Sequence, residues 1–471
     1  MSIWKTKPLS HLLEEAAESE KGLKRTLSSR SLVFMGIGAI IGAGLFSLTG
    51  IAAADHAGPA VVLSFILAAV GCAFAGLCYA EFASMIPVAG SAYTYSYATM
   101  GEFIAWVIGW DLVLEYALGA ATVGVSWSSY LNALLGMYGL QIPHALTNAP
   151  ADGGIINLPA IAIIWLLSLL LIRGTKESAF INNLLVIVKL AVVFLFIILG
   201  WKFINPAYHT PFIPKNTGVM GEFGISGIAA GAGLVFFAFI GFDAVSTAAQ
   251  EARNPQKGMP IGILGSLIVC TILYVLFSYV MTGLVPYQTF KGDASPAATA
   301  FKVTGYDFLQ TGMIVAILAG YTSVILVMLL GQSRVFYSMS RDGLLPGFFG
   351  DIHKKFRTPW KTNIFFMLFI SIFAGFVPIK SLGHMVSIGT LFAFSLVCLG
   401  VMIMRKTRPD ARRKFKVPLV PYIPIAGILV CIYLMTSLGK ESWERLIIWL
   451  LIGIVIYFFY SRKHSKLNKN Q

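Results

Sequence analysis

Residues 36–46 read GIGAIIGAGLF and lie inside the first long apolar segment of the chain. A second stretch, FIGFD at residues 239–243, lies inside the sixth such segment, and both are expected to break a transmembrane helix. In hydrocarbon an unpaired backbone amide or carbonyl is costly, so irregular backbone survives at membrane depth only where it is buried in protein or lines a cavity. Two interruptions five segments apart therefore predict a binding site built from helix ends.

The composition is that of a polytopic membrane protein. Hydrophobic residues make up 57% of the 471 residues and charged residues only 12%, whereas a soluble domain carries about a quarter charged residues. The expected fold class is all-α and integral to the membrane, with twelve segments that each reach the roughly 20 residues needed to span a bilayer. The segments lie near residues 31–54, 58–86, 94–136, 157–174, 181–203, 225–250, 260–286, 307–337, 360–378, 382–405, 419–438 and 445–461.

The positions of the two interruptions predict an inverted repeat. Segments 1–5 and 6–10 form two halves of opposite orientation, because five is odd, and the interrupted segments 1 and 6 then correspond. This is the organisation of many secondary transporters. Segments 11 and 12 are additional and are expected to pack on the outside.

The net charge of +14 follows the positive-inside pattern. With a cytoplasmic N-terminus, most Lys and Arg residues fall in inside segments, which places both termini in the cytoplasm of a cell-membrane protein. The basic runs also offer contacts to membrane lipids. The expected division is a cytoplasmic N-terminal segment (1–30), a transport core (31–405), two further helices with their preceding loop (406–461) and a cytoplasmic tail (462–471).

The first interruption is expected to bind an anion. The alternative is close helix packing through small residues, which suits Gly38 with Gly42. It suits Gly42-Ala43-Gly44 less well, because an unwound turn there leaves the N–H groups of Ala43, Gly44 and Leu45 at the start of a half-helix. Such an end carries partial positive charge and suits a carboxylate.

The second interruption is expected to bind a cation. The first half-helix ends there, so the carbonyl groups of Phe237, Ala238 and Ile240 become acceptors that suit an ammonium group. Asp243 has two interpretations, as the N-cap of the second half-helix or as a protonatable gate. A carboxylate site and an ammonium site a few ångströms apart describe an α-amino acid.

Charged residues deep in spans are costly and usually functional. Lys189 lies near the centre of the fifth span, and Glu115 lies midway along the third, one helical turn after Asp111. One interpretation is a structural ion pair between Lys189 and a carboxylate. The other is that Lys189 fills a cation site as a tethered charge, with its proton or that of Glu115 coupled to substrate.

Other chemistries find little support in the sequence. The five cysteines all fall within spans, without a CxxC motif or a histidine cluster, so we expect neither a metal site nor a disulfide framework. No nucleophile–base pair is evident, so we expect no enzyme and no cofactor. An accessory membrane protein docking on the N-terminal segment stays open.

These motifs together resemble the amino acid–polyamine–organocation superfamily, and within it the bacterial members of the cationic amino acid transporter family. The likeness covers roughly residues 30–460. The motifs that carry it are GIGAIIGAGLF at 36–46, YAEF at 79–82, GSAY at 90–93, FIGFD at 239–243 and SRDGLLP at 340–346.

The resemblance implies a fold like that of the sodium-coupled leucine transporter, with broken helices 1 and 6 in a 5+5 inverted repeat. It also implies proton-dependent, sodium-independent uptake through a substrate site between segments 1, 3, 6 and 8. In that site Glu115 supports the first break, Lys189 fills a vacated sodium position and Met328 restricts the pocket. The implied substrate contacts are Ile40, Ala43, Gly44, Leu45, Phe237, Ala238 and Ile240.

Relatives often carry Thr where this chain has Ala43, so a hydroxyl that would meet substrate or Glu115 is absent. No acidic residue is clearly placed to meet a cationic side chain, and Met328 narrows the pocket. The interpretation favoured is a proton-coupled permease for small to medium neutral L-amino acids that works by alternating access. An amino acid exchanger, a cationic amino acid carrier, and a non-transporting receptor or channel are the alternatives.

Overall fold

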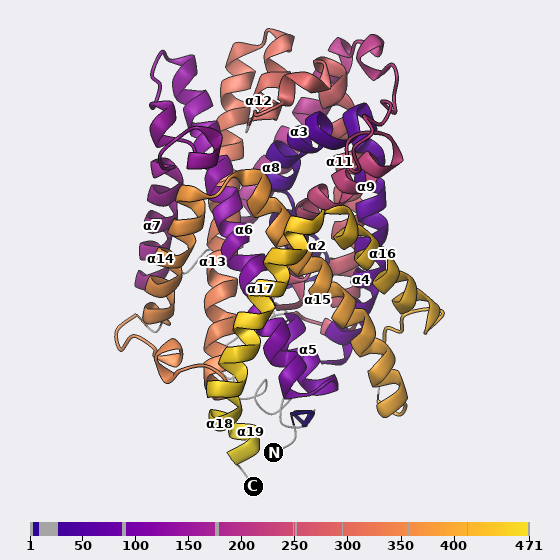
Figure 1. Ribbon diagram of the computed structural model, residues 1–471, viewed down its shortest axis with the longest axis vertical. Helices are drawn as coiled ribbons and strands as arrows, with labels where there is room; N and C mark the ends of the chain where they lie inside the picture. The colour runs from indigo at the N-terminus through magenta and orange to yellow at the C-terminus, as the bar shows by residue number, and fades with distance from the viewer. Residues whose placement is uncertain are drawn as a thin grey trace.

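A computed structural model describes residues 3–8, 27–86, 91–174, 179–247, 249, 252–293, 295–356, 358–411 and 413–469. The regular elements of these residues are helices, and the described chain has one isolated bridge, between Leu27 and Ala252. The axes of the long helices are roughly aligned with one another, and both ends of the chain lie at the same end of the bundle (Figure 1). We refer to that end as the inner end.

Seven helical stretches of the described chain are long and apolar enough to cross a membrane. Five shorter apolar helices of 10–17 residues accompany them. The helices of these two groups are α2 (Ser29–Ile40), α4 (Val61–Met85), α6 (Glu102–Met137), α7 (Leu158–Arg173), α8 (Ala179–Gly200), α9 (Gly224–Val235), α11 (Pro255–Leu284), α13 (Asp307–Arg341), α14 (Trp360–Phe376), α15 (Ile379–Thr407), α16 (Tyr422–Ser437) and α17 (Lys440–Ile456).

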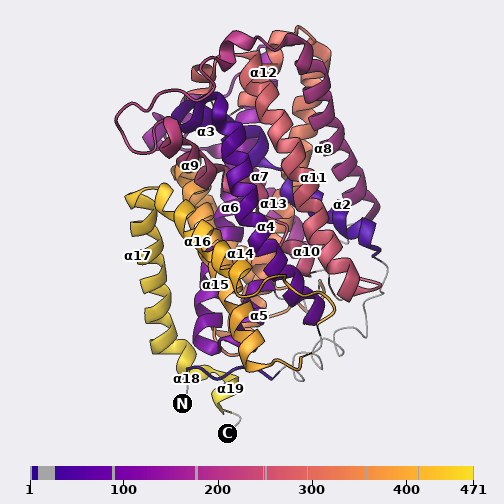
Figure 2. The ribbon, with the colours of Figure 1, turned by 90° about the vertical axis from the view of Figure 1, so that its right-hand side faces the viewer.

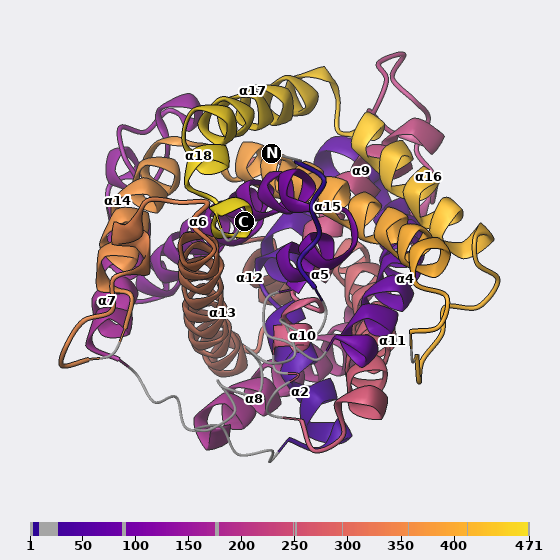
Figure 3. The same cartoon turned by 90° about the horizontal axis from the view of Figure 1, so that it is seen from below.

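The last two apolar helices lie at the rim of the bundle. Seen from the side and from below, α16 and α17 flank α15 at the periphery, whereas α6 runs nearer the middle (Figures 2 and 3). Many side chains of α17 face outward, including Ile448 and Leu451, which are more than half exposed. Such a surface suits contact with lipid, and it agrees with the expectation that these helices pack on the outside.

The third apolar segment is divided, which corrects the expectation of a single span over residues 94–136. A short helix, α5 (Ser91–Thr99), precedes α6, and Gly101 turns the chain between them with a φ of +94°. A side chain at this position would be strained, and its Cβ would lie 2.7 Å from the carbonyl oxygen of Trp4. The turn therefore depends on a glycine that also lets the N-terminal segment approach.

The described part of the N-terminal segment, residues 3–8, forms an extended strap across the inner end. The carbonyl oxygens of Ile3 and Lys5 accept hydrogen bonds of 3.1 Å from backbone N–H groups at the start of α6. Lys7 pairs with Asp342, which follows α13, at 3.0 Å. The remainder of the expected N-terminal segment, apart from residues 27–30, lies outside the described residues.

The C-terminal segment is tied to the same end through Glu102. This carboxylate is fully buried and accepts hydrogen bonds from the hydroxyls of Tyr97 at 3.0 Å and Tyr457 at 3.1 Å, and from Ser465. Because Tyr97 and Glu102 flank the turn between α5 and α6, the network joins this turn to the C-terminal end of the chain.

A second buried carboxylate, that of Glu81 near the inner end of α4, anchors the loop between α15 and α16. It accepts hydrogen bonds from Arg405 at 2.8 and 2.7 Å and from the backbone N–H of Val417 at 2.7 Å. Nε of Arg413 lies 3.2 Å from Oε1 of Glu81. Such a pair is strongly destabilising to break, so this loop is held by charge as well as by packing.

Candidate functional site

The first break lies where the sequence predicts it. Helix α2 ends at Ile40, Ile41 is extended with a ψ of 109°, and helical structure resumes in a π-helical turn at Gly44–Leu48. The N–H of Leu45 donates to the carbonyl of Gly42 at 3.2 Å, so it is not the free donor that we expected. Within the described chain, the N–H groups of Ala43 and Gly44 have no backbone acceptor.

The second break also lies where the sequence predicts it. Helix α9 tightens into a 3-10 turn at Phe236–Phe239, Ile240 is extended with a ψ of 136°, and Gly241 has a φ of +116°. The short helix α10 (Ala244–Thr247) then begins the inner half. Only glycine adopts this conformation at Gly241 without strain, which makes it the pivot of the break.

The two breaks are in direct contact. A Cβ built on Gly44 would lie 2.2 Å from the Cα of Ala238, and one built on Gly241 would lie 2.8 Å from the carbonyl oxygen of Ala39. Backbone thus meets backbone on both sides of the crossing. The N–H end of one half-helix and the C=O end of the other are therefore adjacent, as the amino acid interpretation requires.

Tyr274 of α11 joins the two breaks, and the sequence analysis missed it. Its hydroxyl lies 3.0 Å from the carbonyl oxygen of Ile40 and 2.8 Å from that of Ala238. The carbonyl of Phe237 accepts the N–H of Ile240 at 3.2 Å. Two of the three carbonyls expected to be free therefore have partners, because a tyrosine and a tight turn satisfy them in this conformation. No signal in the sequence singles out Tyr274, because α11 carries five other hydroxyl residues.

The predicted substrate contacts other than Met328 come from the two breaks, and all eight residues are buried. Seven of the eight residues are apolar side chains less than a tenth exposed: Ile40, Ala43, Leu45, Phe237, Ala238, Ile240 and Met328, with Gly44 buried among them. The structure is therefore a closed conformation. A carrier of this geometry must open to admit a ligand.

Met328 lies on the helix that faces the first break. A Cβ on Gly119 of α6 would lie 2.8 Å from its sulfur, so Met328 packs into the interface between α6 and α13. One turn earlier, Val324 faces Gly42, with a Cβ at that glycine 3.5 Å from its methyl group. Residues of α13 therefore line the crossing from the side.

Lys189 is buried and contacts the first half-helix. Its Nζ donates a 2.7 Å hydrogen bond to the carbonyl oxygen of Gly38, and its stem lies against Gly320 of α13. No carboxylate of the described chain lies within ion-pair distance of Lys189, so the alternative of a structural ion pair is wrong. Gly38 lies in the last turn of α2, so the ammonium group of Lys189 contacts the C-terminal end of the first half-helix.

Glu115 and Asp243 come together on the inner side of the crossing. Both are 1% exposed or less, and the hydroxyl of Tyr116 donates to Asp243 at 3.0 Å. The neighbours of Glu115 are Asp243, Asp111 and the hydroxyl of Thr390, so it lies beside the second break. At the start of α10, the N–H groups of Val245 and Ser246 donate to the backbone carbonyls of Phe242 at 3.2 Å and of Asp243 at 2.8 Å.

Comparison with known proteins identifies the family. A family model described as amino acid permease matches residues 27–460. The chain belongs to the amino acid permease family. The permease is therefore a multi-pass membrane protein of a transport family, as its helices indicate.

Three curated relatives match this permease over almost its whole length. The methylthioribose transporter of Bacillus subtilis (strain 168) is 45% identical over 99% of this chain and 100% of its own. The branched-chain amino acid permease BcaP of the same organism is 46% identical over 99% of each chain. The vacuolar cationic amino acid transporter 4 of Arabidopsis thaliana is 32% identical over 95% of this chain and 93% of its own.

An aromatic layer closes the permease above the first break. The hydroxyl of Tyr130 donates to the carbonyl of Phe46 at 2.5 Å, and the hydroxyls of Tyr321 and Ser47 are 3.1 Å apart. The rings of Tyr130 and Tyr321 meet edge to face, with centroids 5.6 Å apart. These contacts join α6 and α13 to the π-helical turn at Gly44–Leu48, where helical structure resumes after the first break.

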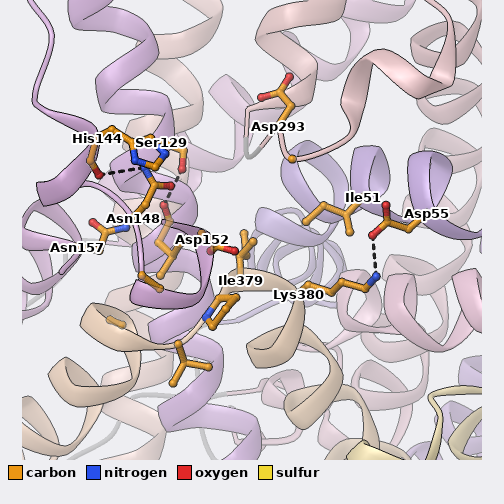
Figure 4. A pocket seen from close by; sticks show the side chains of 16 residues that line it. Ile51, Asp55, Ser129, His144, Asn148, Asp152, Asn157, Asp293, Ile379 and Lys380 are labelled. Atoms are coloured by element: carbon orange, nitrogen blue, oxygen red, sulfur yellow. Dashed lines mark hydrogen bonds and ion pairs between the residues drawn. The ribbon is translucent and has the colours of Figure 1, made fainter. Parts of the chain in front are cut away.

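A polar pocket of about 330 Å³ lies on the outer side of this layer. Figure 4 shows its lining, with Ile51 from the outer half of helix 1 and an ion pair of 2.6 Å between Asp55 and Lys380. Burial raises the pKa of Asp152, which also lines the pocket, above its ordinary value. This pocket is separate from the crossing of the breaks and forms a vestibule above it.

Proposed function

We propose that this permease takes up small to medium neutral L-amino acids together with protons and without sodium. The observation that supports it most is the contact between Gly44 and Ala238, which brings two half-helix ends of opposite polarity together. One end offers the N–H groups of Ala43 and Gly44 to a carboxylate. The other offers carbonyl oxygens to an ammonium group, and each oxygen has two lone pairs.

In this proposal the substrate backbone binds both breaks at once. Its carboxylate meets the first break at Ala43, Gly44 and Leu45, where the partial positive charge of the half-helix is concentrated. Its ammonium group meets the second break at Phe237, Ala238 and Ile240. The carbonyl oxygens that now accept the hydroxyl of Tyr274 then accept the substrate's ammonium group, either together with that hydroxyl or in its place.

Lys189 supports independence from sodium. Its ammonium group already binds the carbonyl of Gly38, so the positive charge that a sodium ion would bring to helix 1 is built into the chain. Protons supply the coupling, through Glu115 and Asp243. Two buried carboxylates side by side favour a proton on at least one of them.

The proposed architecture is twelve transmembrane helices in the cell membrane, with a 5+5 inverted repeat and both termini in the cytoplasm. The basic runs support the orientation, and the matching breaks support the repeat. Transport follows from alternating access around the crossing. Membrane lipids surround the helices, and an accessory membrane protein at the N-terminal segment stays an untested part of the proposal.

The apolar side chains beside the two breaks support a substrate with a neutral side chain. Met328 and Ile40 offer no charge, which favours substrates such as those named for the branched-chain permease of Bacillus subtilis. The similarity to a methylthioribose transporter supports a second candidate, a neutral ribose thioether. Such a substrate has neither the carboxylate nor the ammonium group that the two half-helix ends match.

The test is uptake of radiolabelled leucine into liposomes that contain the purified permease. We expect an inward proton gradient to raise uptake, sodium to have no effect, and neutral amino acids to compete more strongly than arginine or lysine. Uptake that ignores the gradient and requires internal amino acid would show an exchanger instead. Competition by methylthioribose, but by none of the twenty amino acids, would favour the second candidate.

A further inference from the structure

Two carboxylates in the inner half of α6, those of Asp111 and Glu115, are buried and form no ion pair with the described residues. Asp111 and Glu115 lie one helical turn apart on α6, and Asp243 begins the inner half of helix 6; each is 1% exposed or less. Neither oxygen of Asp111 or of Glu115 accepts a hydrogen bond from the described residues. A buried acceptor left in this state is costly, and more so if it is charged.

Two hydroxyl groups beside these carboxylates are also incompletely bonded. Tyr95 of α5 is 1% exposed and lies beside Asp243 and Ser246, yet neither hydroxyl completes a hydrogen bond of ordinary geometry within the described chain. Buried polar groups that lack protein partners usually hold water or a ligand. We call Asp111, Glu115, Asp243, Tyr95 and Ser246 the inner polar chamber.

Among the described residues, no cation neighbours Asp111 or Glu115. The charged neighbours of Glu115 are Asp111 and Asp243, both acidic. The helices packed around it add neutral titratable groups, namely Tyr79 of α4, Tyr95 of α5 and Tyr116 of α6, while α15 adds the hydroxyl of Thr390. Lys189 is occupied with helix 1. Protons are therefore the positive charge that the chamber takes up most readily.

We propose that Asp111 exchanges the coupling proton between the substrate site and the inner end. The inference rests on the proposed proton coupling. Asp111 lies one turn nearer the inner end than Glu115, roughly 14 Å along α6 from Glu102. A proton that leaves the carboxyl group of Glu115 is taken by the carboxylate of Asp111, which then releases it to inner water.

The packing around Asp111 leaves room for this exchange. The helix that faces it, α15, presents Gly389, where a Cβ would lie 3.2 Å from Oδ1 of Asp111. A larger residue would press on the carboxylate. Because Gly389 has no side chain, space remains beside the carboxylate of Asp111, which accepts no hydrogen bond from the described residues.

The experiment compares proton-driven accumulation with exchange in liposomes, using labelled leucine for both measurements. Exchange of internal for external leucine moves no net proton, so it does not require Asp111. For Asp111→Asn we expect at least a tenfold loss of gradient-driven accumulation and exchange within twofold of the parent. Asp111→Glu should restore accumulation. Asp307→Asn, which removes an exposed carboxylate at the outer end of α13, is the control and should leave both unchanged.

The outcomes separate the two proposals. A parent protein that exchanges leucine but ignores the proton gradient would overturn the proposed coupling and this inference with it. A proton-driven parent whose Asp111→Asn variant accumulates normally, or loses exchange as well, would overturn this inference alone. If Asp111→Asn does not fold, Gly389→Ala replaces it, with the same expected loss of coupling; unchanged coupling there contradicts the role of Asp111.

Discussion

The two breaks differ in what satisfies them. At the first, the N–H groups of Ala43 and Gly44 lack backbone acceptors and no ionisable side chain lies within the break. At the second, a turn bonds the carbonyl of Phe237 and Tyr274 bonds that of Ala238, and Asp243 follows shortly after them in the chain. The first break is thus ready for an anion in this closed state, whereas the second must rearrange its hydrogen bonds to receive a cation. Binding at the second break is therefore the step to which a conformational change or a proton is most readily linked.

The largest loss of transport is expected when a side chain is added where the two breaks touch. In Gly44→Ala the new methyl group would lie 2.2 Å from the Cα of Ala238, which is backbone and cannot move aside. We expect leucine uptake to fall to background. Gly42→Ala is the matched control, since its methyl group would meet Val324 at an ordinary 3.5 Å. If both variants transport equally, the breaks do not need to touch.

The next effect concerns the charge behind the first break. Lys189→Ala removes the ammonium group from the carbonyl of Gly38, and we expect at least a hundredfold loss of uptake with folded protein retained. Folding should survive because no buried carboxylate of the described chain loses a partner. Size-exclusion chromatography and thermal unfolding check the fold. Unchanged uptake would show that the first break works without this charge.

A smaller effect should follow from removing the bridge at the second break. Tyr274→Phe deletes one hydroxyl that bonds the carbonyls of Ile40 and Ala238, at a cost of about 1–3 kcal/mol in the closed state. We expect a lower midpoint of thermal unfolding and a roughly tenfold change in the apparent affinity for leucine. Tyr279→Phe on the same helix is the control, because its hydroxyl contacts neither break. Equal effects of the two variants would mean that the bridge has no special role.

The smallest effect is on selectivity. Met328→Ser shortens a side chain beside the first break, so larger or cationic amino acids should compete better for leucine uptake by several-fold. The uptake of leucine itself should change little. Competition by the twenty amino acids measures this, and an unaltered profile would place Met328 outside the pocket.

The sequence predicts the breaks because glycine spacing and membrane physics act locally. Both breaks, the burial of Lys189 and the outer position of the last two helices follow from such patterns. The partner of Lys189 does not, because a hydrogen bond to the carbonyl of Gly38 depends on how α8 crosses α2. The role of Tyr274 could not be predicted for the same reason, since nothing in its own helix marks it as the residue that reaches both breaks.

The division of the third segment shows a related limit. Residues 94–136 are continuous in hydropathy, and the turn at Gly101 is fixed by contact with Trp4 of the N-terminal segment. Two adjacent carboxylates on α6 are visible in the sequence. Their meeting with Asp243 is visible only once helix 6 is folded against α6.

The strap at residues 3–8 has a practical consequence for producing this protein. Its backbone is hydrogen-bonded to the start of α6, and Lys7 pairs with Asp342. An expression clone trimmed to begin at the first apolar helix would lose these bonds and uncover Glu102 and its neighbours. Affinity tags and fluorescent fusions therefore belong after a flexible spacer, with Ile3 to Lys7 kept intact, and a shortened clone is a poor starting point for crystallisation.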